Sequence, residues 1–291
     1  MSQVTWRGGS LTSLRGSMAI TSARALVGGF SRSLSSFPIA IPRWISSASE
    51  PYPASKKKNV RVYISESHDP FFNLATEDWL FRNADLEEET LFLWRNKPTI
   101  VIGRNQNPWK EIHIGKMEEA GVVLSRRQSG GGAVYQDLGN TNFTFVSHRD
   151  EFSKERNNAI LIAALASFNV PVVASGRNDI VMSGDDGRKI SGSAFKFTKD
   201  RAFHHGTLLI DVQLNALGAL LNPSKAKLLS KGITSVAARV VNLTEINSAI
   251  THESLSAAIM REFYQCYSEE ESEAGWLGRH GYVGAFTYIC N

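Results

Sequence analysis

Cysteine is nearly absent from this 291-residue chain, which contains only Cys266 and Cys290. Two cysteines near one end cannot form a disulfide framework, and they are too few for a four-cysteine zinc site. Long apolar runs are also absent, because the most apolar stretch, 159–168, is far shorter than the roughly 20 residues that a membrane-spanning helix needs. The sequence therefore indicates a globular protein that does not insert into a membrane.

Acidic residues are missing from the first 49 positions, which carry five arginines among many serines. This composition is typical of organelle transit peptides, and the compact apolar segment of a secretory signal is lacking. We therefore expect a mitochondrial transit peptide, with chloroplast import as the alternative. The chain after residue 49 contains 27 basic and 28 acidic residues, so the net charge of +4 does not indicate nucleic-acid binding.

Short apolar runs alternate with helical patterns along the rest of the chain. The runs predict strands at 61–65, 90–95, 99–103, 122–126, 180–182, 190–191 and 206–210. They also predict a hairpin of 133–136 with 142–147 that turns at Leu138, Gly139 and Asn140. Helical spacing predicts helices at 153–168, at 253–267 and at 74–82, the last with Asn73 as its N-cap. The predicted fold class is α+β, a mixed β-sheet domain with flanking helices.

Three consecutive glycines, Gly130, Gly131 and Gly132, follow Arg126 and Arg127 between two predicted strands. Glycines let backbone amides approach a ligand, and guanidinium groups beside them suit phosphate oxygens. The segment is not a Walker A loop, because the Gly-Lys-Ser/Thr ending is missing. A glycine run by itself is more often a tight turn than a nucleotide site, and with both arginines beside it the two are about equally frequent, so other residues must decide.

Two charged residues and a histidine pair follow the glycine run. Asp179 could hold Mg²⁺, and Lys189 could neutralise a phosphate, although either alone is more often a turn or surface residue. His204 and His205 are adjacent in a predicted strand, so their side chains point to opposite faces and cannot easily chelate one metal. We expect a hydrogen-bonded structural role for His205, which leaves His204 as the candidate pocket residue.

These segments occur together and in order, with 103–111 and 231–236 as further matches. The set resembles the signature of the bacterial type A lipoate-protein ligases and the mitochondrial lipoyltransferases, over about residues 61–267. The resemblance implies the fold of the biotin and lipoate ligase catalytic domains. It also implies that lipoate and ATP form lipoyl-AMP, from which a lysine of an acceptor protein takes the lipoyl group. The implied acceptors are lipoyl domains of 2-oxoacid dehydrogenase complexes and the H protein of glycine cleavage.

The resemblance further implies a role for each site residue. Lys189 would be catalytic and would bind both the acyl carbonyl and the phosphate, and Asp179 would position Mg²⁺. Lipoate would contact Lys189 and His204. ATP and its adenylate would contact Lys189, Arg127, Gly130, Gly131, Gly132, Ala133, Val134 and Tyr135. Octanoyl transferases instead use a cysteine nucleophile, which this motif region lacks.

We divide the chain into a transit peptide and linker (1–55), a lipoate ligase-type catalytic domain (56–267) and a divergent tail (268–291). The bacterial ligases continue into a small C-terminal domain associated with activation, and the tail is too short to replace it. Three readings stay open: a complete ligase, a transferase for preformed lipoyl-AMP, and a catalytic subunit that needs a separate accessory domain. A chain that only binds lipoate or lipoyl domains is the non-enzymatic alternative.

Overall fold

A computed structural model describes residues 52–53, 58–176, 178–184, 187–221, 239–267 and 285–289. All of them belong to the larger of two units into which the chain divides, Ala48–Asn291. Except for Tyr52 and Pro53, the predicted transit peptide lies outside the described residues, as do Arg177 and segment 231–236. None of the helices described has the length and hydropathy needed to span a bilayer.

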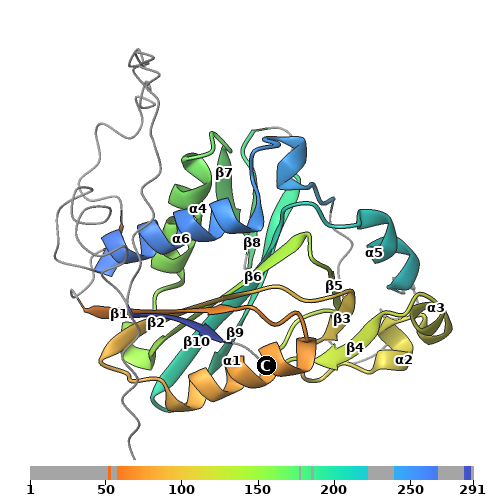
Figure 1. Cartoon of the computed structure of the whole chain (residues 1–291), viewed down its shortest axis with the longest axis horizontal. Helices are drawn as coiled ribbons and strands as arrows, with labels where there is room; N and C mark the ends of the chain where they lie inside the picture. The colour runs from red at the N-terminus through yellow and green to blue at the C-terminus, as the bar shows by residue number, and fades with distance from the viewer. Residues whose placement is uncertain are drawn as a thin grey trace, which may run out of the picture. The chain divides into compact units, whose positions relative to one another are not determined.

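Eight strands form one mixed sheet that runs through the middle of the described chain (Figure 1). β1 is parallel to both of its neighbours, β11 and β2, and all the other neighbours in this sheet are antiparallel. The fold class predicted from sequence is thereby confirmed. In spatial order the strands are β11 (Ala285–Ile289), β1 (Asn59–Ser65), β2 (Glu88–Trp94), β6 (Asn140–His148), β10 (Arg201–Leu209), β9 (Lys189–Phe197), β8 (Asp179–Met182) and β7 (Val172–Ser175).

A smaller sheet carries the glycine run. It consists of β4 (Val123–Arg126), β3 (Thr99–Ile102) and β5 (Val134–Gln136), in that order. The predicted hairpin of 133–136 with 142–147 is wrong, because β5 pairs with β3 whereas β6 lies in the large sheet. The carbonyl of Gly139 accepts hydrogen bonds from the amides of Ile210 (3.0 Å) and Asp211 (2.9 Å), and these bonds hold the turn against the end of β10.

Helices cover both faces of the large sheet (Figure 1). α4 (Lys154–Ala166) and α6 (His252–Tyr267) pack together on one face, and α1 (Pro70–Asn83) lies on the other. In β2, Leu91 and Leu93 join the core beneath α4 and α6, while Phe92 packs with Leu80 of α1. Because both faces are covered, this strand is apolar without alternation. The remaining helical elements are α2 (Pro108–Glu111), α3 (Ile114–Glu119), α5 (Leu214–Leu220), η1 (Arg149–Glu151) and η3 (Leu243–Glu245).

Helix α1 begins one turn earlier than the sequence pattern predicted. Its N-cap is Asp69, whose carboxylate accepts hydrogen bonds from the amides of Phe71 (2.9 Å) and Phe72 (3.0 Å). Pro70 occupies the first turn, where a missing amide donor leaves no hydrogen bond unmade. Asn73, the predicted cap, is instead fully buried inside the helix and donates to the carbonyls of Ser67 and Arg95, both at 2.9 Å.

The tail contributes a strand that the sequence pattern did not predict. β11 pairs in parallel with β1, from Arg61 opposite Ala285 to Ser65 opposite Ile289. Residues from the two ends of the described chain therefore lie side by side at one edge of the large sheet.

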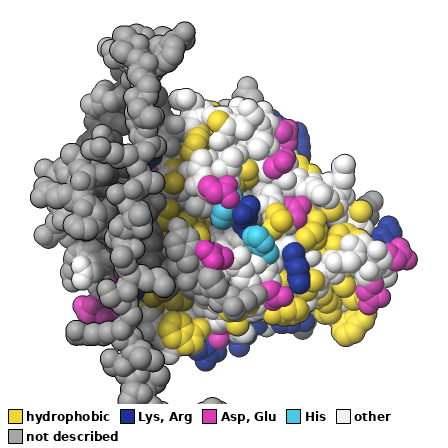
Figure 2. Space-filling view, in the orientation of Figure 1, with side chains coloured by type: hydrophobic (Ala, Val, Ile, Leu, Met, Phe, Trp, Pro, Cys, Tyr) yellow, Lys and Arg dark blue, Asp and Glu magenta, His cyan; other side chains and the backbone are white. Residues whose placement is uncertain are grey.

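The surface mixes both signs of charge. Figure 2 shows basic and acidic side chains interspersed on one face, with hydrophobic side chains between them. Among the described residues of this face, no continuous basic patch of the kind that marks a nucleic-acid-binding surface is seen.

Candidate functional site

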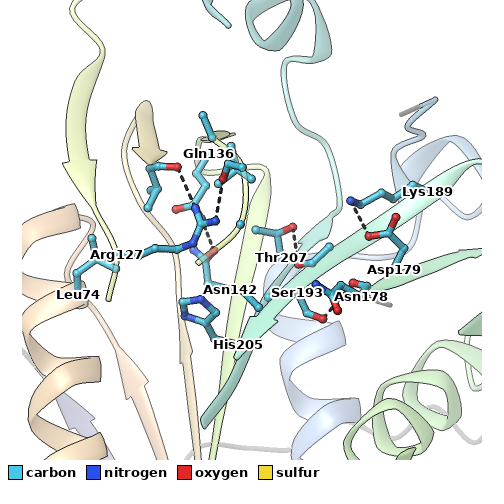
Figure 3. A pocket seen from close by; sticks show the side chains of 18 of the residues that line it. Leu74, Arg127, Gln136, Asn142, Asn178, Asp179, Lys189, Ser193, His205 and Thr207 are labelled. Atoms are coloured by element: carbon cyan, nitrogen blue, oxygen red, sulfur yellow. Dashed lines mark hydrogen bonds and ion pairs between the residues drawn. The ribbon is translucent and has the colours of Figure 1, made fainter. Parts of the chain in front are cut away.

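A cavity of about 450 Å³ is lined by α1 and by strands of both sheets. Its volume lies in the range typical of small-molecule sites. Figure 3 shows Leu74 and Arg127 on one side of the view, Asp179 and Lys189 on the other, and Thr207 between them. Apolar walls come from Leu74, Trp94, Val101, Ala133 and Val134, and polar ones from Asn178, Asp179, Lys189 and Ser193. One cavity therefore offers an apolar compartment and a charged one.

Arg127 lines this cavity but directs most of its donors into the glycine run itself. Its Nη2 donates to the carbonyls of Gly130 (2.6 Å) and Gly132 (2.7 Å), and its Nη1 donates to the carbonyl of Val101 (3.1 Å). Burial lowers the pKa of this guanidinium to about 10, and the Glu77 carboxylate counteracts the effect in part. In this structure Arg127 holds the loop in shape, so its expected contact with the nucleotide remains a prediction.

Arg126 is also committed to backbone carbonyls. Its Nη1 lies 3.0 Å from the carbonyl oxygen of Gly103, 3.1 Å from that of Arg104 and 2.8 Å from that of Gln106. The hypothesis that two guanidinium groups stand ready for phosphate oxygens is therefore corrected for Arg126. Its side chain fixes the turn that supports the glycine run.

The strand after the glycine run alternates between cavity and core. Gly131, Gly132, Ala133 and Val134 line the cavity, as the resemblance implied. Tyr135 does not, because successive strand residues point to opposite faces, and its ring packs in the core of the small sheet. Burial raises its pKa to about 12, with a smaller contribution from Asp137. Gly130 is also absent from the cavity lining, and its carbonyl accepts a hydrogen bond from Arg127.

Lys189 and Asp179 meet on one wall of the cavity. The ammonium of Lys189 lies 2.8 Å from Oδ1 of Asp179, and both side chains keep part of their surface exposed. The pairing of β8 with β9 shifts register between Ile180 and Val181, which brings Lys189 opposite Val181 while Asp179 faces Gly192. The backbone of Lys189 is also tied to the segment beyond, through the carbonyl of Arg239 at 2.8 Å. The strands predicted from sequence at 180–182 and 190–191 lie within β8 and β9, and Asp179 and Lys189 are the first residues of these two strands.

Asp179 does not form a magnesium site with other carboxylates of the described chain. No group of three histidine, cysteine or acidic side chains with metal-binding geometry occurs in that part of the chain. Oδ1 of Asp179 is already occupied by the Lys189 ammonium. The residues present do not fit a resident cation, whereas Mg²⁺ held mainly by phosphates and water needs only one or two carboxylates.

The two histidines occupy opposite faces of β10, as strand geometry predicts, but the pocket assignment is wrong. His204 is fully buried among Phe143, Phe145 and Phe195, and it does not line the cavity. Burial, and to a smaller extent the neighbouring His205 and Lys154, lowers its pKa to about 3. The sequence could not decide which histidine faces the cavity, because that depends on which side of the sheet α4 and α6 cover.

His205 is the histidine of the cavity wall. Its Nδ1 lies 2.7 Å from Oε1 of Glu77, and its Nε2 lies 2.6 Å from the hydroxyl of Ser129. The predicted hydrogen-bonded role of His205 is confirmed. These contacts connect helix α1 to the residue that precedes the glycine run.

Several residues of the wall were not predicted. Gln136 donates to Asn142 at 2.8 Å and accepts from Asn96 at 2.9 Å, so a row of buried amides backs the cavity (Figure 3). In the sequence, these amides are marked only as polar residues in or beside apolar strands. That signal is weak because many sheets contain such residues. Leu74 and Trp94 had no signal that separates them from ordinary core residues.

Comparisons with known proteins identify the family. The model of the lipoyl protein ligase A/B catalytic domain matches residues 69–264. The chain is similar to LipL1 of P. falciparum, crystallised in complex with lipoate, at 36% identity and a TM-score of 0.65. That alignment covers 79% of this chain and 66% of the other, so the chain spans slightly less than two thirds of that relative.

Two more distant structures show the same fold. One is the bi-partite lipoate protein ligase of Thermoplasma acidophilum, solved in a study of this ligase and its E2 lipoyl domain, with 23% identity, a TM-score of 0.62 and coverage of 74% and 88%. The other is lipoate-protein ligase A bound with ATP, with 22% identity, a TM-score of 0.58 and coverage of 75% and 90%. Since the family model matches well over half of the chain, the chain belongs to the lipoyl protein ligase A/B catalytic domain family of enzymes.

Proposed function

We propose that this protein forms lipoyl-AMP from lipoate and ATP and transfers the lipoyl group to a lysine of an acceptor protein. The observation that carries the proposal is that apolar side chains, the glycine loop and Lys189 all line the same cavity. The apolar wall suits a dithiolane and its carbon chain, and the loop amides suit an adenylate phosphate. The lipoate complex of the P. falciparum relative and the ATP complex of ligase A support both substrates.

In the first step, a carboxylate oxygen of lipoate attacks the α-phosphorus of ATP, and the bond to pyrophosphate breaks. In the second step, the amine of the acceptor lysine attacks the acyl carbon, AMP leaves, and the amine proton passes to solvent. Negative charge grows on oxygens in both transition states. The ammonium of Lys189, held in the cavity wall by Asp179, is placed to stabilise this charge.

Mg²⁺ enters as part of the ATP substrate in this scheme. Asp179 is the cavity carboxylate that would meet it, and the triphosphate and water would supply most of its ligands. His205 and not His204 lines the cavity, so this scheme gives His204 no contact with lipoate.

The acceptors that we propose are lipoyl domains of 2-oxoacid dehydrogenase complexes and the H protein of glycine cleavage. The E2 lipoyl domain studied with the T. acidophilum ligase supports this class of acceptor. We also propose import into mitochondria, or alternatively chloroplasts, through the arginine- and serine-rich first 49 residues, and a catalytic unit at 56–267. Localisation of a fluorescent fusion with and without residues 1–49 tests the targeting.

A transferase that uses only preformed lipoyl-AMP is the second candidate, together with a catalytic subunit that requires a separate accessory domain. The bi-partite character of the T. acidophilum ligase is a precedent for a separate part.

One experiment separates these readings. The full chain is incubated with a lipoyl domain and either lipoate plus Mg-ATP or chemically made lipoyl-AMP, and the acceptor is weighed by mass spectrometry. Modification in both mixtures establishes a self-sufficient ligase. Modification with lipoyl-AMP alone supports the transferase or the subunit reading, and no modification in either mixture supports an inactive binder and overturns the proposal.

A further inference from the structure

Glu77 is a buried carboxylate of α1 that lies behind the cavity wall and does not line it. Only 2% of this residue is exposed. Its Oε1 accepts a hydrogen bond from the hydroxyl of Thr144 at 2.6 Å and pairs with Nδ1 of His205 at 2.7 Å. A buried carboxylate destabilises a fold unless its oxygens are hydrogen-bonded, so the position of Glu77 depends on these partners.

The hydrogen bonds continue from His205 to the glycine loop. Nε2 of His205 lies 2.6 Å from the hydroxyl oxygen of Ser129, and this oxygen also accepts from Nε of Arg127 at 3.1 Å. In this series of hydrogen bonds, the guanidinium of Arg127 at one end can only donate, and the carboxylate of Glu77 at the other end can only accept.

The direction of every hydrogen bond follows from these two ends. The hydroxyl of Ser129 has one hydrogen to give, and of its two partners only Nε2 of His205 can accept it. The ring of His205 then accepts at Nε2 and carries a proton on Nδ1, from where it donates to Glu77. The carboxylate thereby sets the tautomer of an imidazole that lies in the cavity wall.

The end of this hydrogen-bond series at the glycine loop is held tightly. Ser129 directly precedes the glycines, and its carbonyl accepts from the amide of Arg104 at 2.8 Å. Arg127, which also contacts the Ser129 hydroxyl, holds the carbonyls of Gly130 and Gly132. A shift of Ser129 therefore moves Gly131 and Gly132, which line the cavity.

We propose that Glu77 is a positioning residue, which sets the glycine loop for the adenylate through His205 and Ser129. This inference rests on the function proposed for the cavity. Glu77 does not line the cavity and acts through the glycine loop, so its removal should weaken adenylate binding and leave the binding of free lipoate in the apolar compartment largely unchanged. The negative charge of Glu77 also attracts the buried guanidinium of Arg127, so the two ends of the hydrogen-bond series interact electrostatically as well.

The test compares Glu77→Gln and Ser129→Ala with Thr144→Val as the matched control. Thr144 donates to the same oxygen of Glu77 but is not part of the hydrogen-bond series that leads to the glycine loop. Valine keeps the shape of its side chain. Calorimetry measures the affinity of each full-length variant for a nonhydrolysable lipoyl-AMP analogue and for free lipoate, and thermal melting checks the fold. We expect analogue binding to weaken about tenfold in Glu77→Gln and in Ser129→Ala, as for loss of a hydrogen bond to a charged group, and less than twofold in Thr144→Val.

Nitrogen-15 NMR of the His205 ring supplies a readout that does not depend on activity. The wild-type ring is expected to carry its proton on Nδ1, and this preference should weaken in Glu77→Gln, where a neutral amide oxygen replaces the charged acceptor. A proton on Nε2 in the wild type would overturn the proposal, as would an affinity loss in Glu77→Gln and Ser129→Ala no larger than in Thr144→Val.

The two proposals fail in different ways. If the wild type binds the analogue, Glu77→Gln and Ser129→Ala weaken this binding, and no lipoyl domain is ever modified, only the proposed function is overturned. If the wild type modifies the lipoyl domain and Glu77→Gln binds the analogue as tightly as the wild type does, only the role of Glu77 is overturned. If the wild type does not bind the analogue, both proposals are overturned.

Discussion

The side chain of Lys189 crosses directly over Gly192, so that a Cβ at position 192 would lie 2.7 Å from the ammonium nitrogen of Lys189. No such atom fits without displacing the end of the lysine, which is held there by its ion pair with Asp179. The absence of a side chain at this strand position is therefore part of the way in which the cavity places its cation.

Gly192→Ala is expected to reduce lipoyl transfer more than it reduces stability, because the clash is with the flexible end of a side chain. The comparison is Gly206→Ala, in which the new Cβ would meet the ring of Phe143 at 2.5 Å and the carbonyl oxygen of Gly192 at 2.7 Å. That variant should lower the melting temperature more, since ring and backbone cannot move aside cheaply. Equal effects on both properties in both variants would contradict the assignment.

Lys189→Ala is expected to lower the rate of transfer from lipoyl-AMP by about 100-fold or more, the usual effect of removing a donor to a developing oxyanion. The melting temperature should change little, because the lysine side chain is partly exposed. The rate is measured by mass spectrometry of the acceptor. Lys199→Ala, an exposed lysine just beyond the end of β9, serves as the control and should transfer at the wild-type rate.

Gly103→Ala is expected to weaken nucleotide binding, because the added Cβ would overlap with the carbonyl oxygen of Gly131 in the neighbouring loop. Gly115→Ala is the matched control in α3, where nothing lies within 4 Å of the new atom. This second change should stabilise the protein by about 0.5–1 kcal/mol through helix propensity and leave binding unchanged. Calorimetric titration with the lipoyl-AMP analogue and urea unfolding give the two quantities.

Glu89→Gln is expected to stabilise the protein at neutral pH. Burial raises the pKa of Glu89 to about 7, and the attraction of Lys58 at 3.6 Å only partly offsets this. Since the unfolded carboxyl has its ordinary pKa of 4.5, the folded state binds more protons between pH 4.5 and 7, and its stability falls as the pH rises through this window.

The advantage of Glu89→Gln over the wild type should be of the order of 1–3 kcal/mol above pH 7 and disappear near pH 4.5. Urea unfolding at a series of pH values measures it. Glu87→Gln, at an exposed position of the same segment, is the control and should change the stability little. A constant difference across the range would contradict a raised pKa for Glu89.

His204→Leu is expected to leave lipoate transfer intact and to stabilise the protein in mild acid. Neither ring nitrogen of His204 has a hydrogen-bond partner among the described residues. Burial lowers its pKa from 6.5 to about 3, so the unfolded state binds more protons in between, and the wild type loses stability as the pH falls through this window. Unfolding at pH 7.5 and pH 5 tests the difference, and loss of transfer would restore His204 as a lipoate ligand.

The order of the motifs, the apolar strands and the two longest helical patterns were readable from the sequence, because they depend on local periodicity and on residue types with strong backbone preferences. The two short strands that begin at Asp179 and Lys189 were also readable, but the ion pair between these residues depends on the register of the strands and was not predicted. The start of α1 was missed because Asp69 and Asn73 are both good caps, and the choice between them was made by the buried contacts of Asn73.

Only the tertiary structure decided which side chains reach the cavity. Strand geometry requires that His204 and His205 diverge, but the helices that cover one face of the sheet determine that His205 is the one beside the glycine loop. Arg126 and Arg127 carry the charge expected of phosphate ligands, yet their hydrogen bonds go to carbonyls that lie near them only after the chain has folded. Glu77 had no signal at all in the sequence, because its partner His205 is 128 positions away and hydrogen bonds over such a separation leave no local pattern.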